Sequence, residues 1–160
     1  MTKKEVQQRV LQNGKPLSLD KFEWDEKTNT FSSEEGCLVL DFVGVEGCTF
    51  NTGSVCTFKT SFYCTFDTGS YCTFDTGSYC TFETGYDCTF NTGFGCTFKT
   101  EENCVVVRRD IYEVIELKSG QKIKLNDYLV EGYQAIDEPT LSGKKVKVEL
   151  DGKTYTATLD

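Results

Sequence analysis

The feature that most constrains this chain is an eight-residue repeat in its middle third. From Cys48 onward the sequence runs CTFNTGSV, CTFKTSFY, CTFDTGSY, CTFDTGSY, CTFETGYD, CTFNTGFG and CTFKTEEN, and Cys104 then opens a different segment. A short fixed period is typical of repeat architectures, in which each unit buries its apolar face only by stacking against its neighbours. The repeat therefore predicts a solenoid.

Side chains alternate within each unit. The Cys, the Phe and the second Thr fall on one side of an extended chain, and the first Thr and a variable fourth residue fall on the other. This alternation, with Thr and Phe enriched, is typical of strands. The fourth residue is Asn, Lys, Asp or Glu, so its side faces water. We therefore predict a core of Cys48, Phe50, Cys56, Phe58, Cys64, Phe66, Cys72, Phe74, Cys80, Phe82, Cys88, Phe90, Cys96 and Phe98.

The Thr-Gly-Ser-Tyr part of each unit predicts a corner. Glycine adopts positive φ without a steric penalty, so we expect a positive φ at the corner glycines. These are Gly53, Gly69, Gly77, Gly85 and Gly93, while Ser61 and Glu101 take the same place in two units.

The sequence leaves the coil length open. A coil of 16 residues forms two facing sheets, and a coil of 24 forms a triangular prism. At 16, Asp67 lies beside Glu83, and like charges on facing strand positions destabilise by a fraction of about 1 kcal/mol. In a coil of 24 residues, the stacked fourth residues would instead carry opposite charges. Stacking of Tyr63 on Tyr79 favours 16.

The nine cysteines are predicted to be reduced, buried thiols. Eight of them follow the repeat, their number is odd, and the N-terminus has no export signal, whereas disulfide frameworks usually have irregular spacings. Stacked disulfides and a bound metal remain alternatives, although no Cys-x-x-Cys pair is present. We expect no metal, no cofactor, no membrane span and a cytoplasmic location.

The flanks predict caps, which cover the open ends of a solenoid. Residues 1–47 are expected to form an N-terminal cap, in which Thr2 and Glu5 make a capping box and Gly14 ends a short helix. Strands are expected at 22–24 and 30–31, paired around 25–29, and at 37–43.

Residues 105–160 are expected to form a C-terminal β module after the repeat solenoid of 48–104. A strand over 105–117 should turn back into 122–125. The chain should end in a hairpin of 145–150 and 153–158, turning at Asp151-Gly152, that sits apart from the solenoid. The predicted fold is thus an all-β, right- or left-handed parallel β-solenoid with a short N-terminal helix and a C-terminal hairpin module.

The sequence predicts no enzymatic chemistry. It contains no histidine, which removes the usual general base and the commonest metal ligand. It has no phosphate-binding loop and no dinucleotide fingerprint. Ice binding is disfavoured because the next outward residue after the first Thr is variable and often charged.

The charge distribution favours a protein partner. The chain carries a net charge of −8, and the repeat region holds six acidic residues against two basic ones. A nucleic-acid binder would carry a basic stripe, so direct binding to DNA or RNA is disfavoured. The expected binding surface is one acidic patch made of Asp67, Asp75, Glu83 and Asp87.

The octads, the segment GKPLSLDKFEW from Gly14 and the exit CVVVRRD from Cys104 resemble small octapeptide-repeat proteins of bacteriophages and mobile elements. More loosely, the chain is similar to pentapeptide-repeat proteins, some of which imitate DNA. The resemblance implies a non-catalytic, phage-type interaction protein in the cytoplasm of a bacterial host. Its partner would be a host protein, and this chain would inhibit a nucleic-acid-handling or defence enzyme of the host. The alternative is a structural or self-associating virion component, so homo-oligomers stay open.

Overall fold

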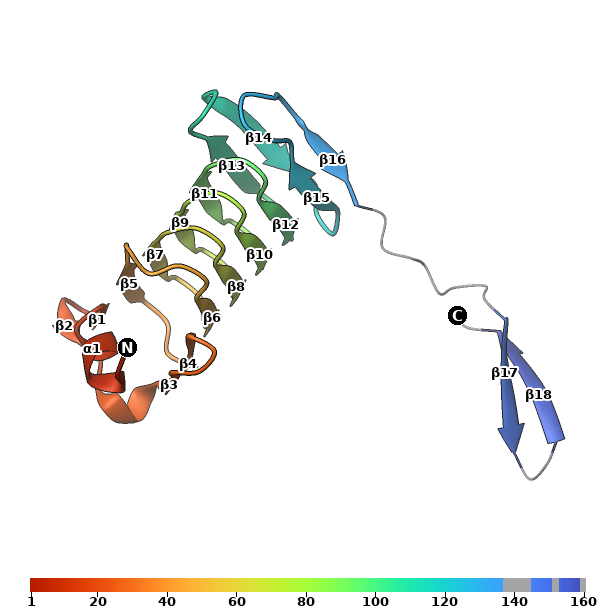
Figure 1. Ribbon diagram of the computed structural model, residues 1–160, viewed down its shortest axis with the longest axis horizontal. Helices are drawn as coiled ribbons and strands as arrows, with labels where there is room; N and C mark the ends of the chain where they lie inside the picture. The colour runs from red at the N-terminus through yellow and green to blue at the C-terminus, as the bar shows by residue number, and fades with distance from the viewer. Residues whose placement is uncertain (137–144, 151–152, 159–160) are drawn as a thin grey trace.

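The protein is a β-solenoid with a short N-terminal helix (Figure 1). The computed structural model describes residues 1–136 and the backbone of two further strands, Lys145–Leu150 and Lys153–Thr158. Two eight-stranded sheets face each other, and the chain alternates between them from β4 to β13. In spatial order, sheet A holds β14 (Glu113–Leu117), β13 (Cys104–Arg108), β11 (Thr89–Thr92), β9 (Thr73–Asp75), β7 (Thr57–Thr60), β5 (Leu38–Phe42), β1 (Val10–Gln12) and β2 (Lys15–Pro16).

Sheet B is the second eight-stranded sheet and faces sheet A. In spatial order it holds β16 (Tyr133–Ala135), β15 (Lys122–Leu125), β12 (Thr97–Thr100), β10 (Thr81–Thr84), β8 (Thr65–Thr68), β6 (Thr49–Thr52), β4 (Thr30–Ser33) and β3 (Glu23–Asp25). The parallel ladder thus begins at β4, before the first octad, because Phe31 takes the place of a repeat phenylalanine beside Phe50.

Each coil of the repeat contains 16 residues, since Thr49 pairs with Thr65 and the parallel strands from β6 to β13 all keep that offset. The entry coil is longer, because Phe31 pairs with Phe50 and Leu40 with Phe58. Tyr63 and Tyr79 stack as expected, with ring centroids 5.4 Å apart. The argument from charge for a coil of 24 residues was wrong, because Asp67 does lie beside Glu83. Both side chains are exposed to water, which weakens their repulsion.

The predicted core is confirmed, because all fourteen of its Cys and Phe side chains are at most 1% exposed. Phenylalanines of one sheet stack in a row and meet the other row edge to face; Phe58 and Phe74, for example, lie 4.9 Å apart at 3°. The cysteines form two further rows, in which the N–H of Cys56 donates to Sγ of Cys72 at 3.4 Å. Cys37 is exposed, so the prediction that all nine thiols are buried was wrong.

The corners do not work as expected. Positive φ falls on the residue before each repeat cysteine, as at Tyr71 (58°) and Asp87 (55°), and not on the corner glycines. Those glycines instead permit close approach between coils. A Cβ on Gly85 would overlap Oγ of Ser70, the atom that accepts a hydrogen bond from the N–H of Tyr86 at 3.1 Å.

The N-terminal cap closes one end of the solenoid. Helix α1 (Lys3–Gln7) begins with the predicted capping box of Thr2 and Glu5. The expected stop at Gly14 was wrong, since β1 pairs with β5 and converts that segment to strand. A 3-10 turn, η1 (Leu19–Lys21), then leads into the predicted hairpin of β3 and β4.

The C-terminal cap differs from the expected single strand over 105–117. The chain turns at 109–112, and β13 and β14 pair as a hairpin. The following strand β15 pairs with β12 of sheet B, and β16 was not predicted. At this end Arg108 is fully buried and donates to Asp110 at 2.7 Å and to the carbonyl of Val130 at 2.6 Å.

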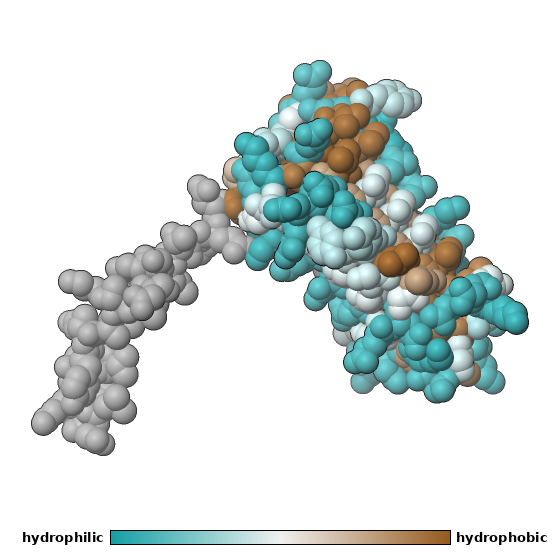
Figure 2. All heavy atoms as spheres, turned by 180° about the vertical axis from the view of Figure 1, so that it is seen from behind, coloured by the Kyte–Doolittle hydropathy of each residue, from teal (hydrophilic) through white to brown (hydrophobic). Residues whose placement is uncertain are grey.

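The terminal hairpin is confirmed as β17 (Lys145–Leu150) and β18 (Lys153–Thr158), in the predicted register. The turn expected at Asp151-Gly152 lies outside the described residues. On the face of the solenoid seen in Figure 2, hydrophilic side chains cover much of both ends, and apolar side chains gather near the C-terminal end. Val114 and Tyr112 are exposed at that end.

Candidate binding groove on sheet B

The outer face of sheet B carries two columns of side chains. Because the coils stack in register, the first Thr of each unit forms one column and the fourth residue forms the other. The second column runs through Ser32, Asn51, Asp67, Glu83 and Lys99. Neighbouring strands lie about 4.8 Å apart, so the six strands from β3 to β12 span roughly 24 Å.

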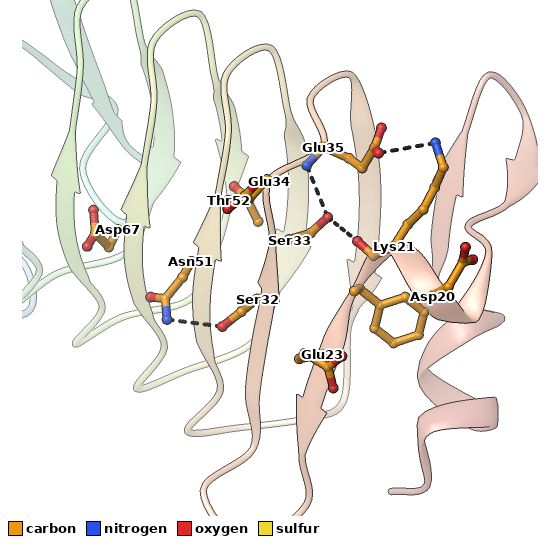
Figure 3. Close-up of a pocket in the computed structure, with 11 residues that line it drawn as sticks. Asp20, Lys21, Glu23, Ser32, Ser33, Glu34, Glu35, Asn51, Thr52 and Asp67 are labelled. Atoms are coloured by element: carbon orange, nitrogen blue, oxygen red, sulfur yellow. Dashed lines mark hydrogen bonds and ion pairs between the residues drawn. The ribbon is translucent and has the colours of Figure 1, made fainter.

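An open groove runs along this face (Figure 3). Its first part has a volume of about 710 Å³ and is lined by Asp20, Lys21, Phe22, Glu23, Ser32, Ser33, Glu34, Glu35, Asn51, Thr52 and Asp67. Asp67 also lines a second hollow of about 260 Å³, with Thr68, Glu83, Thr84, Gly85, Lys99, Thr100, Glu101 and Gly120. We call the two together the sheet B groove.

Hydrogen bonds fix the cap side of the groove. The Ser33 hydroxyl donates to the carbonyl of Lys21 at 2.7 Å and accepts from the N–H of Glu35 at 3.2 Å. The Asn51 amide donates to Ser32 Oγ at 3.3 Å, which links β6 to β4. These contacts hold the wall of the groove in place without a ligand.

The sheet B groove is strongly acidic. Among the described residues that line it, the basic ones are Lys21 and Lys99, against the acidic Asp20, Glu23, Glu34, Glu35, Asp67, Glu83 and Glu101. Both lysines have acidic neighbours: Lys21 lies 3.1 Å from Glu35, and Lys99 lies 3.7 Å from Glu83.

Two of the groove carboxylates have lowered pKa values. Hydrogen bonds from Gln12 and then Lys21 lower the pKa of Glu35, and a hydrogen bond from Ser18 lowers that of Asp20. Both groups are therefore ionised at neutral pH, and they contribute full negative charges to the groove.

The structure brings only part of the predicted acidic patch together. Asp67 and Glu83 are neighbours in the groove. Asp75 lies on sheet A, where its carboxylate accepts a hydrogen bond from Arg109 at 2.7 Å, and Asp87 lies in a corner between the sheets. The prediction of one patch was wrong because successive units alternate between two sheets.

Sequence reasoning missed five acidic residues of the groove: Asp20, Glu23, Glu34, Glu35 and Glu101. The first four lie outside the octads, and the docking of β3 and β4 beside β6 brings them to sheet B. The adjacent pair Glu34-Glu35, between the strands predicted at 30–31 and 37–43, was the available signal.

The repeat thiols face inward and are at most 1% exposed, so they are shielded from reagents in water. Hydrogen bonds along the cysteine rows shift their pKa values in both directions: bonding to Cys64 and Cys96, followed by burial, raises the pKa of Cys80, whereas bonding to Cys72 lowers the pKa of Cys56 to about 7. Across the described part of the chain, no cluster of three or more Cys, Asp or Glu side chains is placed to hold a metal ion.

No protein-family model, no curated protein and no solved structure matches this chain. Among the described residues, no helix has the length and apolar character needed to cross a membrane.

Proposed function

We propose that this protein is a non-catalytic binding module whose sheet B groove docks a basic, extended segment of a protein partner. The observation that carries the proposal is the convergence of seven carboxylates against two lysines in one groove along the solenoid. An extended peptide advances about 3.3 Å per residue, so a segment of seven or eight residues covers roughly 24 Å.

The resemblance to phage proteins supports a host protein as the partner. Enzymes that handle nucleic acids carry basic channels for phosphate backbones, and an acidic groove has the complementary charge. We therefore propose inhibition of such an enzyme as the biological role, with one of its basic, extended segments held in the groove.

The test compares two charge-matched double variants. Asp67→Asn with Glu83→Gln removes two charges from the groove, whereas Glu46→Gln with Glu116→Gln removes two exposed charges elsewhere. The probe is a fluorescein-labelled octa-lysine, and its affinity is measured by fluorescence anisotropy at low salt.

Exposed ion pairs are worth about 0.2–1 kcal/mol each, so the groove variant should bind roughly fivefold more weakly than the parent. The control variant should stay within about twofold, because removing distant charges acts only through the screened overall field. Equal losses in both variants would mean that net charge and not the groove binds the peptide.

A further inference from the structure

Two exposed tyrosines lie in the corner that follows β8 and β10, the strands whose residues Asp67 and Glu83 line the sheet B groove. Tyr71 and Tyr86 are 53% and 42% exposed, and their ring centroids lie 5.2 Å apart in an edge-to-face arrangement at 77°. Both belong to the corner through which the chain leaves sheet B. Tyr86 directly follows Gly85, which lines the groove.

A carboxylate accompanies the two rings. Asp87 follows Tyr86 and occupies the same corner position as Tyr71, one coil further along the solenoid. Both residues have positive φ, and the N–H of each donates to a carbonyl of the next coil at 3.0 Å. Hydrogen bonding to Tyr86 and, more weakly, the charge of Asp87 raise the pKa of Tyr71. The register of the coils places Asp87 next to Tyr71 in the following coil and directly after Tyr86, so its carboxylate accompanies the two rings. We call Tyr71, Tyr86 and Asp87 the tyrosine rim.

The combination of open aromatic rings and a carboxylate suits one kind of cation. A guanidinium is planar and weakly hydrated, so it stacks on an aromatic face while its N–H groups pair with a carboxylate. An ammonium is compact and strongly hydrated, and it gains less from such a site.

We propose that the basic segment in the sheet B groove is anchored by an arginine, stacked on the tyrosine rim and paired with Asp87. This inference rests on the proposed function and adds selectivity for arginine over lysine. It also gives a role to Asp87, which lies outside the groove itself.

The opposite corner provides a matched control. Tyr63 and Tyr79 are also exposed and in contact with each other, but their rings stack face to face at 5°. The equivalent positions in the coils on either side are Gly47 and Gly95. The column of stacked residues at this corner position therefore contains no carboxylate. These tyrosines should not contribute to arginine selectivity.

The experiment compares fluorescein-labelled octa-arginine and octa-lysine, which have equal charge and length, on the full chain at low salt. The parent should bind octa-arginine roughly fivefold more tightly, the scale of an exposed cation–π contact. Tyr71→Leu with Tyr86→Leu, or Asp87→Asn, should reduce that preference to below about twofold, whereas Tyr63→Leu with Tyr79→Leu should keep it. Tyr71→Phe with Tyr86→Phe should also keep it, because the ring faces remain and the corner stays packed.

The outcomes separate the two proposals. Equal binding of both peptides by the parent overturns the arginine anchor and leaves the basic groove standing. Loss of the preference in the Tyr63 and Tyr79 variant, or its survival in the Tyr71 and Tyr86 leucine variant, overturns the assignment to the rim. Binding of neither peptide overturns the proposed function itself.

Discussion

Replacing Phe74 by Ala tests how the aromatic rows hold the solenoid together. The ring is fully buried and stacks on Phe58 and Phe90 at 4.9 and 4.8 Å. It also meets Phe66 and Phe82 edge to face, both at 5.2 Å. Truncating a buried Phe costs about 3–5 kcal/mol, and loss of four aromatic contacts places this site at the upper end of that range.

Phe98 provides the comparison that isolates the aromatic contribution. It is equally buried, but its ring contacts within the described chain are Phe82 at 4.8 Å and Phe90 at 5.0 Å. Ile123 of the cap pairs beside it in place of a further ring. Since an aromatic pair contributes about 0.5–1.5 kcal/mol beyond burial, Phe98→Ala should cost roughly 2 kcal/mol less than Phe74→Ala.

The assay is urea unfolding followed by circular dichroism, with Asp67→Ser as a surface control. The control should change the free energy of unfolding by less than about 0.5 kcal/mol. Equal costs at Phe74 and Phe98, or a larger cost at Phe98, would refute the idea that stacking along the rows stabilises the array beyond simple burial.

Three further predictions concern the thiols, the C-terminal cap and the corners. Thiol labelling of the native protein should modify Cys37 alone, and denaturant should release eight more thiols without any reductant; fewer than nine in total would reveal disulfides. Burial opposes ionisation of Asp110, but hydrogen bonds from Arg108 prevail and hold the pKa of its carboxyl below the ordinary 3.8. The ionised carboxylate therefore stabilises the fold above pH 3.8, and this stabilisation is lost as the pH falls through the lowered pKa. Asp110→Asn should therefore lower the melting temperature at pH 7 and flatten its fall in acid, and an unchanged acid profile would exclude this role. Gly85→Ala should destabilise by about 1–3 kcal/mol by overlap with Ser70, and adding Ser70→Gly should recover part of the loss; no cost would show that the coils adjust freely.

The interior was predictable because its pattern is local. Cys, Phe and Thr recur at fixed positions of each octad, and alternation along a strand assigns the buried side without knowledge of the coil. The coil length was not predictable from charge. One exposed contact between Asp67 and Glu83 changes the free energy by a fraction of about 1 kcal/mol, far less than the packing of a row of phenylalanines.

The groove and the corners depend on contacts between coils, which a single octad does not contain. Gly85 is small because Ser70 of the preceding coil approaches it, and the left-handed residue is instead Asp87. The acidic wall contributed by Glu34 and Glu35 depends on how the cap docks onto sheet B. Neither arrangement follows from propensities along the chain.

The most direct test of the acidic groove is a nuclear magnetic resonance titration of the ¹⁵N-labelled protein with octa-arginine. The account predicts that amide shifts concentrate along sheet B, at Glu34, Asp67 and Glu83, and extend to the rim at Tyr86. Amides of sheet A, such as Asp75, should stay unchanged. Shifts centred on sheet A, or spread evenly over the surface, would contradict the claim that sheet B forms the binding site.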